Sequence, residues 1–413
     1  MRKRNLRSFL SLFLPLFFLF FPINAEGDIF EYKHVKDARY RIISVVDQSV
    51  FIDGVLSHSS QVLNRIAVSV TNARDGIGEH SAVYQTSERL IYDSQQKSQT
   101  PSSVFKWERE YDSVFERDKL GHITINHQYF MPMVRSIPVF PGRNLNKGDT
   151  WNVETVEVHD FRDSFGIEEP YRIPFRAFYQ YVGERQWEDS EYYPAFFVNY
   201  NIEIRLPEVR GESYPTRMSA TNSMIIYWDP ENGVEKAYTG TSRITFQMSD
   251  GRTLRFDARS KAELVDAEEM NRETLASEII NEIGRLDIKD VNVNVVDEGI
   301  SLSLEDIRFH PDSERMLPGE EAKLERIAEI LKRYPGRDIV VSGHAALAGS
   351  PEYLMRLSQG RARTIADFLL SRNVRTADRI IIRGYGAERP VADNSTEEGM
   401  RKNRRVEITI LEN

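Results

Sequence analysis

The stretch VSGHAALAGSPEYLMRLSQGRARTIADFLL, Val341 to Leu370, decides the fold of the C-terminal part of this chain. Ser350 suits a helix N-cap, Pro351 suits the first helical position, and Glu352 lies beside the positive end of the helix dipole. One face of this helix is marked by apolar residues at helical spacing: Leu354, Leu357, Ile365, Phe368 and Leu369. Arg361 falls near the middle of that face, where a guanidinium is costly unless an anion meets it.

The segments on both sides of this helix alternate between strand and helix patterns. Strands are predicted in VNVNVVDEGISLSL (291–304), RDIVVSGHA (337–345), RIIIRGYG (379–386) and RRVEITILE (404–412). PGEEAKLERIAEILKRYP (318–335) has the spacing of an amphipathic helix. This order predicts a compact α/β sandwich over about residues 290–413.

The preceding region, residues 26–262, reads as short strands separated by turns. In FFVNYNIEIRL (196–206) apolar and polar residues alternate, and RITFQMSDGRTLRFDA (243–258) predicts a hairpin. We expect an antiparallel β-rich domain, either a sandwich or an open barrel. Residues 263–289 have helical spacing and predict a helical connector to the C-terminal domain. The whole chain is therefore predicted to be an α+β, two-domain protein.

Composition and the first residues indicate an exported protein. MRKRNLR is basic, an apolar run of about 15 residues follows, and Ala25 ends a small-residue site, which is the layout of a signal peptide over residues 1–25. The alternative, an uncleaved anchor, needs a longer run. The chain has no cysteine, so its domains are held by packing without disulfides. A net charge of −9 argues against nucleic acid as a partner.

The C-terminal motifs, taken together, resemble the OmpA-like peptidoglycan-binding domain of outer-membrane porins, peptidoglycan-associated lipoproteins and flagellar stator proteins. The resemblance covers about residues 290–413. It rests on short motifs in family order: Phe309 with Asp312-Ser313, Met316 and Pro318, Gly343-His344, Leu357-Ser358, Arg361-Ala362 with Ile365, Gly384-Tyr385-Gly386, Pro390 and Asn403-Arg404-Arg405-Val406. The family implies an α/β sandwich fold and non-covalent contact with peptidoglycan.

The resemblance also implies which residues form the site. In this family the arginine at the position of Arg361 grips a carboxylate of the stem peptide, usually on meso-diaminopimelate, as a planar guanidinium does well. The peptidoglycan-binding residues are then Phe309, Asp312, Ser313, His344, Arg361 and the substituted position Ala346, with Asn403 and Arg404 at the rim. From the residues alone, Arg361 could instead form a buried ion pair with Asp312 or Glu352, and His344 could be a loop hydrogen-bonding group.

Two substitutions depart from the family pattern. Ala346 stands where the family usually has the aspartate that takes the ligand's amino group, and Leu354 stands where it usually has asparagine. The pocket is therefore less polar than usual. Either the domain binds a wall with a different diamino acid, such as ornithine, or the fold persists after wall binding has weakened.

The sequence carries no enzyme, metal or cofactor motif, such as an HExxH helix, a GxSxG elbow or a phosphate-binding glycine loop. We therefore expect a non-enzymatic protein of the bacterial envelope, in the periplasm or associated with the outer membrane, without metal or cofactor. Its main function would be peptidoglycan contact, with a possible envelope protein as partner of the β-rich domain. The alternative is an OmpA-like fold that no longer binds the wall and serves as an interaction scaffold or adhesin.

Overall fold

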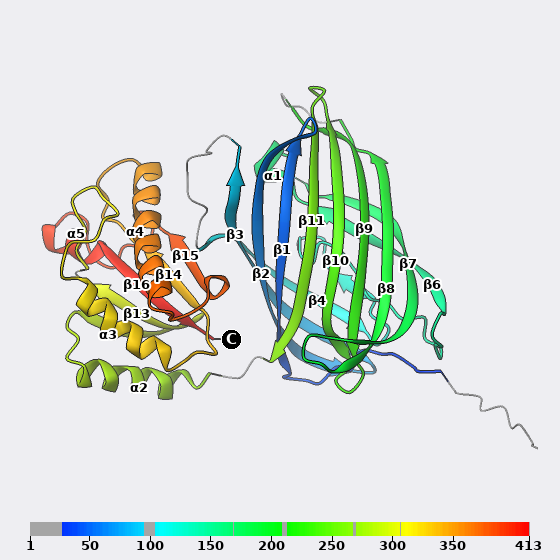
Figure 1. The fold of residues 1–413 in the computed structure, drawn as a ribbon, viewed down its shortest axis with the longest axis horizontal. Coiled ribbons are helices and arrows are strands. Elements are labelled where there is room, and N and C mark those ends of the chain that lie inside the picture. Colours follow the sequence, from blue (N-terminus) through cyan, green and yellow to red (C-terminus); the bar gives the residue numbers. More distant parts are fainter. Residues whose placement is uncertain are drawn as a thin grey trace, which may run out of the picture.

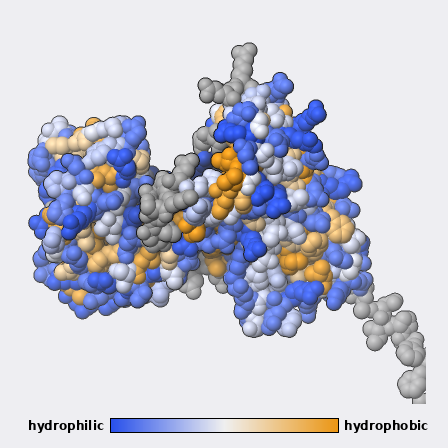
Figure 2. Space-filling view, turned by 45° about the horizontal axis from the view of Figure 1, so that its top comes forward, coloured by the Kyte–Doolittle hydropathy of each residue, from blue (hydrophilic) through white to orange (hydrophobic). Residues whose placement is uncertain are grey.

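The computed structural model describes residues 27–94, 104–167, 169–208, 213–266, 270–305 and 307–412. The predicted signal peptide, residues 1–25, lies outside the described residues. Within those ranges, no helix has both the length and the apolar character needed to cross a membrane. Figure 2 shows a largely hydrophilic surface on the visible face, with hydrophobic residues gathered in smaller patches.

The N-terminal region is an antiparallel β-structure, as predicted. Its elements are β1 (Arg39–Ile52), β2 (Val55–Arg74), β3 (Ile77–Asp93), β4 (Phe105–Asp118), β5 (Ile123–Ile125), β6 (Thr150–His159), α1 (Arg162–Phe165), β7 (Tyr171–Gln186), β8 (Tyr192–Arg205), β9 (Pro215–Asp229), β10 (Val234–Met248) and β11 (Thr253–Asp266). The strands follow the order β4-β3-β2-β1-β11-β10-β9-β8-β7-β6 in one sheet, which Figure 1 shows to be strongly curved. The first and last strands of this region, β1 and β11, are therefore neighbours inside the sheet.

Local sequence patterns explain several of these strands. In β8, Val198, Tyr200 and Ile202 are buried and alternate with more exposed residues, as the period of two predicts. The predicted hairpin is confirmed as β10 and β11, in which Ile244 pairs with Phe256 and Phe246 pairs with Leu254. Their aromatic side chains join a large buried cluster on one face of the sheet.

The C-terminal region is a mixed α/β structure with four helices, also as predicted. Its elements are α2 (Arg272–Arg285), β12 (Val291–Val296), β13 (Gly299–Glu305), α3 (Glu321–Lys332), β14 (Ile339–Gly343), α4 (Pro351–Ser371), the 3-10 turn η1 (Ala377–Arg379), β15 (Ile380–Gly384), α5 (Glu397–Asn403) and β16 (Arg405–Leu411). The strand order is β12-β13-β16-β14-β15, and β14 and β15 are parallel. The four helices complete the α/β layers.

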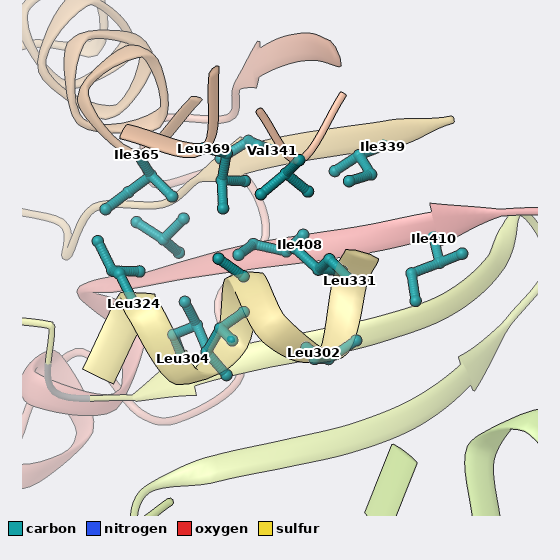
Figure 3. Close-up of a cluster of buried hydrophobic side chains, with 14 of the residues drawn as sticks. Leu302, Leu304, Leu324, Leu331, Ile339, Val341, Ile365, Leu369, Ile408 and Ile410 are labelled. Carbon is teal, nitrogen blue, oxygen red and sulfur yellow. The ribbon is translucent and has the colours of Figure 1, made fainter. Parts of the chain in front are cut away.

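The core of this region lies between the sheet and helices α3 and α4. Figure 3 shows side chains from three strands and two helices meeting there: Leu302 and Leu304 of β13, Leu324 and Leu331 of α3, Ile339 and Val341 of β14, Ile365 and Leu369 of α4, and Ile408 and Ile410 of β16. All are fully buried. Ile279 of α2 joins the same cluster, so the predicted connector helix packs on the C-terminal region.

A close contact between β14 and α4 positions the helix. A Cβ atom added to Gly343 would lie 2.0 Å from the backbone oxygen of Ser358, so only glycine allows this approach. Ser358 is fully buried, and its Oγ accepts a hydrogen bond from the backbone N–H of Gly386 at 2.9 Å. The helix that carries Arg361 is thus held against both the β14 strand and the loop after β15.

The two regions meet through the pairing of one strand from each and through a buried cluster of ion pairs. The start of β4 pairs in parallel with β15, with Phe105 opposite Ile381, so that the strands of both regions belong to one sheet. On the neighbouring surface, Arg65 of β2 lies 2.8 Å from Asp338, which also lies 2.7 Å from Arg379. Arg65 and Asp338 are 4% and 5% exposed, so this pair is shielded from water.

Candidate functional site

The first turn of α4 is built as the sequence predicts. The Ser350 side chain accepts a hydrogen bond from the backbone N–H of Tyr353 at 3.3 Å, and Pro351 occupies the first turn of the helix. The inward face includes Leu354, Ala362 and Ile365, all buried. This packing carries Arg361, two turns further along, to the edge of the core.

Arg361 is 9% exposed and is held by groups from the segment before α3. Its Nε donates a hydrogen bond to the backbone oxygen of Ser313 at 3.1 Å, and its guanidinium lies 5.0 Å from the centre of the Phe309 ring. The Tyr353 hydroxyl donates to Asp312 Oδ1 at 3.1 Å. The structure therefore brings Phe309 and Ser313 against Arg361 in the middle of α4, and Asp312 against Tyr353 in its first turn.

The guanidinium of Arg361 is partly desolvated. Burial lowers its pKa, the nearby charge of Arg404 lowers it further, and Tyr353 and Asp312 oppose the change. Among the described residues, no carboxylate forms an ion pair with Arg361, so the alternative pairing with Asp312 or Glu352 is not formed there. A buried cation without a counter-charge is costly.

His344 and Ala346 lie on the loop after β14, with different neighbours. His344 is 2% exposed, its ring stacks on Tyr385 at 5.0 Å, and its Nε2 lies 3.5 Å from Glu407. Burial lowers the pKa of His344, and Glu407 opposes this change. Ala346 is 4% exposed and presents no polar side-chain atom. The contacts of His344 are thus separate from those of Arg361.

Asn403, predicted at the rim, organises the loop between β15 and α5. The residue is fully buried at the end of α5, and both the oxygen and the nitrogen of its side-chain amide form hydrogen bonds. Oδ1 accepts from the N–H groups of Val391 and Ala392 at 2.8 and 3.0 Å, and Nδ2 donates to Ala392 O and Asn394 Oδ1 at 2.8 and 2.9 Å. Arg404, the next residue, is exposed and lies 3.5 Å from Glu397.

Replacing Asn403 with alanine will destabilise this loop and the C-terminal region. The change leaves buried backbone groups of the 391–394 loop without partners, which costs about 2–3 kcal/mol. Amide hydrogen exchange will show faster exchange at Val391 and Ala392, and thermal unfolding will begin at a lower temperature. Lys402→Ala, which shortens the half-buried side chain of the neighbouring residue, is the control. Unchanged exchange at both amides would contradict this role.

Tyr353 was not anticipated from the sequence. Its hydroxyl donates a hydrogen bond to Asp312, 41 positions away. The available signal was a polar aromatic residue in the first turn of a helix that carries a buried arginine. Its partner, Asp312, lies outside that helix. No group of three or more histidine or acidic side chains among the described residues is arranged to hold a metal ion.

The fold and this site define a class: an α/β domain that carries one buried arginine at the middle of the helix α4. A model of the OmpA family matches residues 308–404, which contain Phe309, Arg361 and Asn403. The chain belongs to the OmpA family through this domain. Members of this family are structural proteins and not enzymes.

Three relatives show how far the likeness extends. Outer membrane porin F of Pseudomonas aeruginosa is 35% identical over 105 residues, covering 25% of this chain and 30% of the porin. Peptidoglycan-binding protein ArfA of Mycobacterium tuberculosis is 38% identical over 104 residues, covering 25% of this chain and 32% of that protein. The peptidoglycan-associated lipoprotein of Brucella melitensis is 37% identical over 123 residues, covering 30% of this chain and 67% of the lipoprotein. The chain thus spans about a third of the first two.

Proposed function

We propose that this protein binds peptidoglycan non-covalently in the bacterial envelope and that Arg361 grips a carboxylate of the stem peptide. The observation that carries the proposal is the burial of Arg361 without a carboxylate partner among the described residues. Phe309 covers one side of the guanidinium, and Arg404 adds positive charge nearby. A planar guanidinium in this setting can bind a carboxylate by donating two charge-assisted hydrogen bonds to it. Two relatives, the peptidoglycan-binding protein ArfA and the peptidoglycan-associated lipoprotein, support the same ligand by their names.

The remaining predicted residues take supporting roles in this proposal. Asp312 holds Tyr353 beside the arginine, and the Ser313 carbonyl orients the guanidinium while leaving its outer nitrogens for the ligand. Asn403 shapes the adjoining loop, and His344 supports the rim through Tyr385. We further propose export by a signal peptide over residues 1–25. A β-rich domain (26–262), a connector (263–289) and the OmpA-like domain (290–413) then make up the chain.

Cosedimentation of the full chain with purified sacculi tests the function directly. Binding is expected to saturate, and a soluble muropeptide carrying diaminopimelate is expected to displace the protein. A second muropeptide with ornithine, which lacks the side-chain carboxylate, is expected to compete less well. Failure to sediment with sacculi of either chemistry would refute the proposal. The second candidate, an interaction scaffold without wall binding, would then be favoured, since Ala346 has already removed one polar contact of the family pocket.

Restoring the family aspartate will tighten binding. Ala346→Asp supplies a carboxylate for the ligand's amino group, and one added charge-assisted contact corresponds to about tenfold in affinity. Isothermal titration with the diaminopimelate muropeptide measures the change. Leu347→Asp, which adds the same charge at a residue that is 64% exposed, is the matched control and should leave affinity unchanged. Equal effects of the two variants would show that position 346 does not face the ligand.

A further inference from the structure

A cavity of about 340 Å³ lies inside the β-rich region, away from the OmpA-like site. One wall is formed by side chains on one face of the curved sheet, including Ile42 of β1, Ile66 of β2 and Met224 of β9. The opposite wall is the segment after β4, through Met131 and Ile137. The volume lies in the range of small-molecule sites, and apolar side chains make up most of the lining.

The charged groups at this cavity are already paired. Arg117 lies 3.8 Å from Glu235, which also accepts a hydrogen bond from the Tyr32 hydroxyl. The Arg117 guanidinium stacks over the Tyr32 ring at 4.6 Å. Tyr40 on this wall is half-buried, and burial raises its pKa to about 12. Because Glu235 offsets the charge of Arg117, this cavity suits an apolar chain better than an acidic group.

A second, polar cavity of about 790 Å³ adjoins the first, and Asn222, Thr241 and Ser242 line both. Hydroxyl and amide side chains dominate its lining. Its charged residues balance one another: Asp47, Arg243, Asp257 and Arg259. Ser60 also lines it, is 2% exposed, and has no hydrogen-bond partner for its Oγ. A buried hydroxyl without a partner is unusual and is satisfied if a ligand supplies a polar group.

The rim beside the polar cavity is apolar and exposed. Strand β1 ends there and β2 begins there, with Ile52 and Val55 36% and 70% exposed, and β3 ends there with Leu90 and Ile91 37% and 41% exposed. Ile91 itself lines the polar cavity. Exposed apolar residues gathered next to a cavity are a feature of surfaces that receive ligands from an apolar phase.

From this arrangement we propose that the β-rich region binds a single-chain amphiphile with an uncharged, hydroxyl-bearing head. The aliphatic chain occupies the apolar cavity between the sheet and the segment after β4. The head lies in the adjoining polar cavity, where Asn222, Ser242 and Ser60 offer hydrogen bonds. This site is separate from peptidoglycan binding and does not depend on Arg361.

Octyl glucoside, used below its micelle-forming concentration, is a suitable probe for the full chain. Methyl NMR is expected to show saturable shifts at Met131 and Met224, on the two walls of the apolar cavity. Ala262→Leu fills part of this cavity and should weaken binding about tenfold. Ala73→Leu, on β2 and outside both cavities, is the matched control and should bind within about twofold of the unchanged chain.

Ser242→Leu, at the junction of the two cavities, gives a second test if Ala262→Leu does not fold, as judged by circular dichroism. Octanoate and glucose are compared as an acidic chain and a head without a chain. Tighter binding of octanoate would overturn the uncharged head, and shifts of equal size with glucose would overturn the role of the chain. Absence of shifts with octyl glucoside would overturn the site altogether. Because sacculus binding is measured separately, none of these results affects the proposed function.

Discussion

Arg361→Ala is expected to lower the affinity of the full chain for a diaminopimelate muropeptide about 100-fold. Arg361 is 9% exposed, its Nε is held by the Ser313 carbonyl, and Phe309 lies against its guanidinium. These contacts fix the side chain in place before the ligand arrives, so little rotamer freedom is lost on binding. Removing the guanidinium would remove both hydrogen bonds that we propose to the ligand carboxylate. Isothermal titration calorimetry with the purified muropeptide measures the difference.

One further variant separates charge from geometry at this position, and a second serves as its control. Arg361→Lys keeps the charge but loses the planar pair of donors, so an intermediate affinity is expected. Arg363→Ala, which removes an arginine from the same helix two positions away, is the matched control and should leave affinity unchanged. If Arg361→Ala and Arg363→Ala bind equally well while both remain folded, the carboxylate grip is wrong.

Asp338→Asn is expected to destabilise the protein by about 3 kcal/mol. Asp338 is the common partner of Arg65, from the β-rich region, and of Arg379, from the turn before β15. Losing its charge leaves the nearly fully buried Arg65 guanidinium without a counter-ion, although Arg65 still donates to the Asp378 carbonyl at 2.8 Å. Urea denaturation followed by circular dichroism measures the free energy of unfolding. Asp287→Asn, which breaks an exposed pair with Lys289, is the control and should have little effect.

The same cluster predicts how stability depends on pH. Burial on its own raises the pKa of Asp338, but the charges and hydrogen bonds of Arg65 and Arg379 outweigh it and hold that pKa below its ordinary value. The carboxylate therefore contributes stability above its unfolded pKa of about 3.9, and this contribution is lost as the pH falls through the lower folded pKa. The difference between the unchanged chain and Asp338→Asn should be full at pH 7 and shrink below about pH 4. A difference independent of pH would assign the effect to packing instead.

The two regions should consequently unfold together near neutral pH. The parallel pairing of β4 with β15 and the Arg65–Asp338 pair both cross between them. Trp107 of β4 adds to this contact, because the Arg383 guanidinium lies 3.3 Å from the centre of its ring. We expect Asp338→Asn to broaden or split the thermal transition, since the cation–π contact and the strand pairing would then hold the junction alone.

By itself the sequence determined the features that depend on neighbours along the chain. The cap at Ser350, the inward face of α4 and the β10–β11 hairpin follow from side-chain periodicity and turn residues, which act within a few positions. The ordered motifs of the last third also identified the OmpA family and Arg361. Phe309 and Ser313 contact Arg361 in the structure, because the segment before α3 packs on α4 at this point.

The tertiary structure alone decided the features that join distant residues. Tyr353 meets Asp312 across 41 positions, and Arg65 meets Asp338 across 273. The single curved sheet, its shared edge with β15 and the two adjoining cavities depend on which strands pair and how far the sheet bends. Local propensity carries no information on such pairings, because they are chosen by the burial and polar satisfaction of the whole fold.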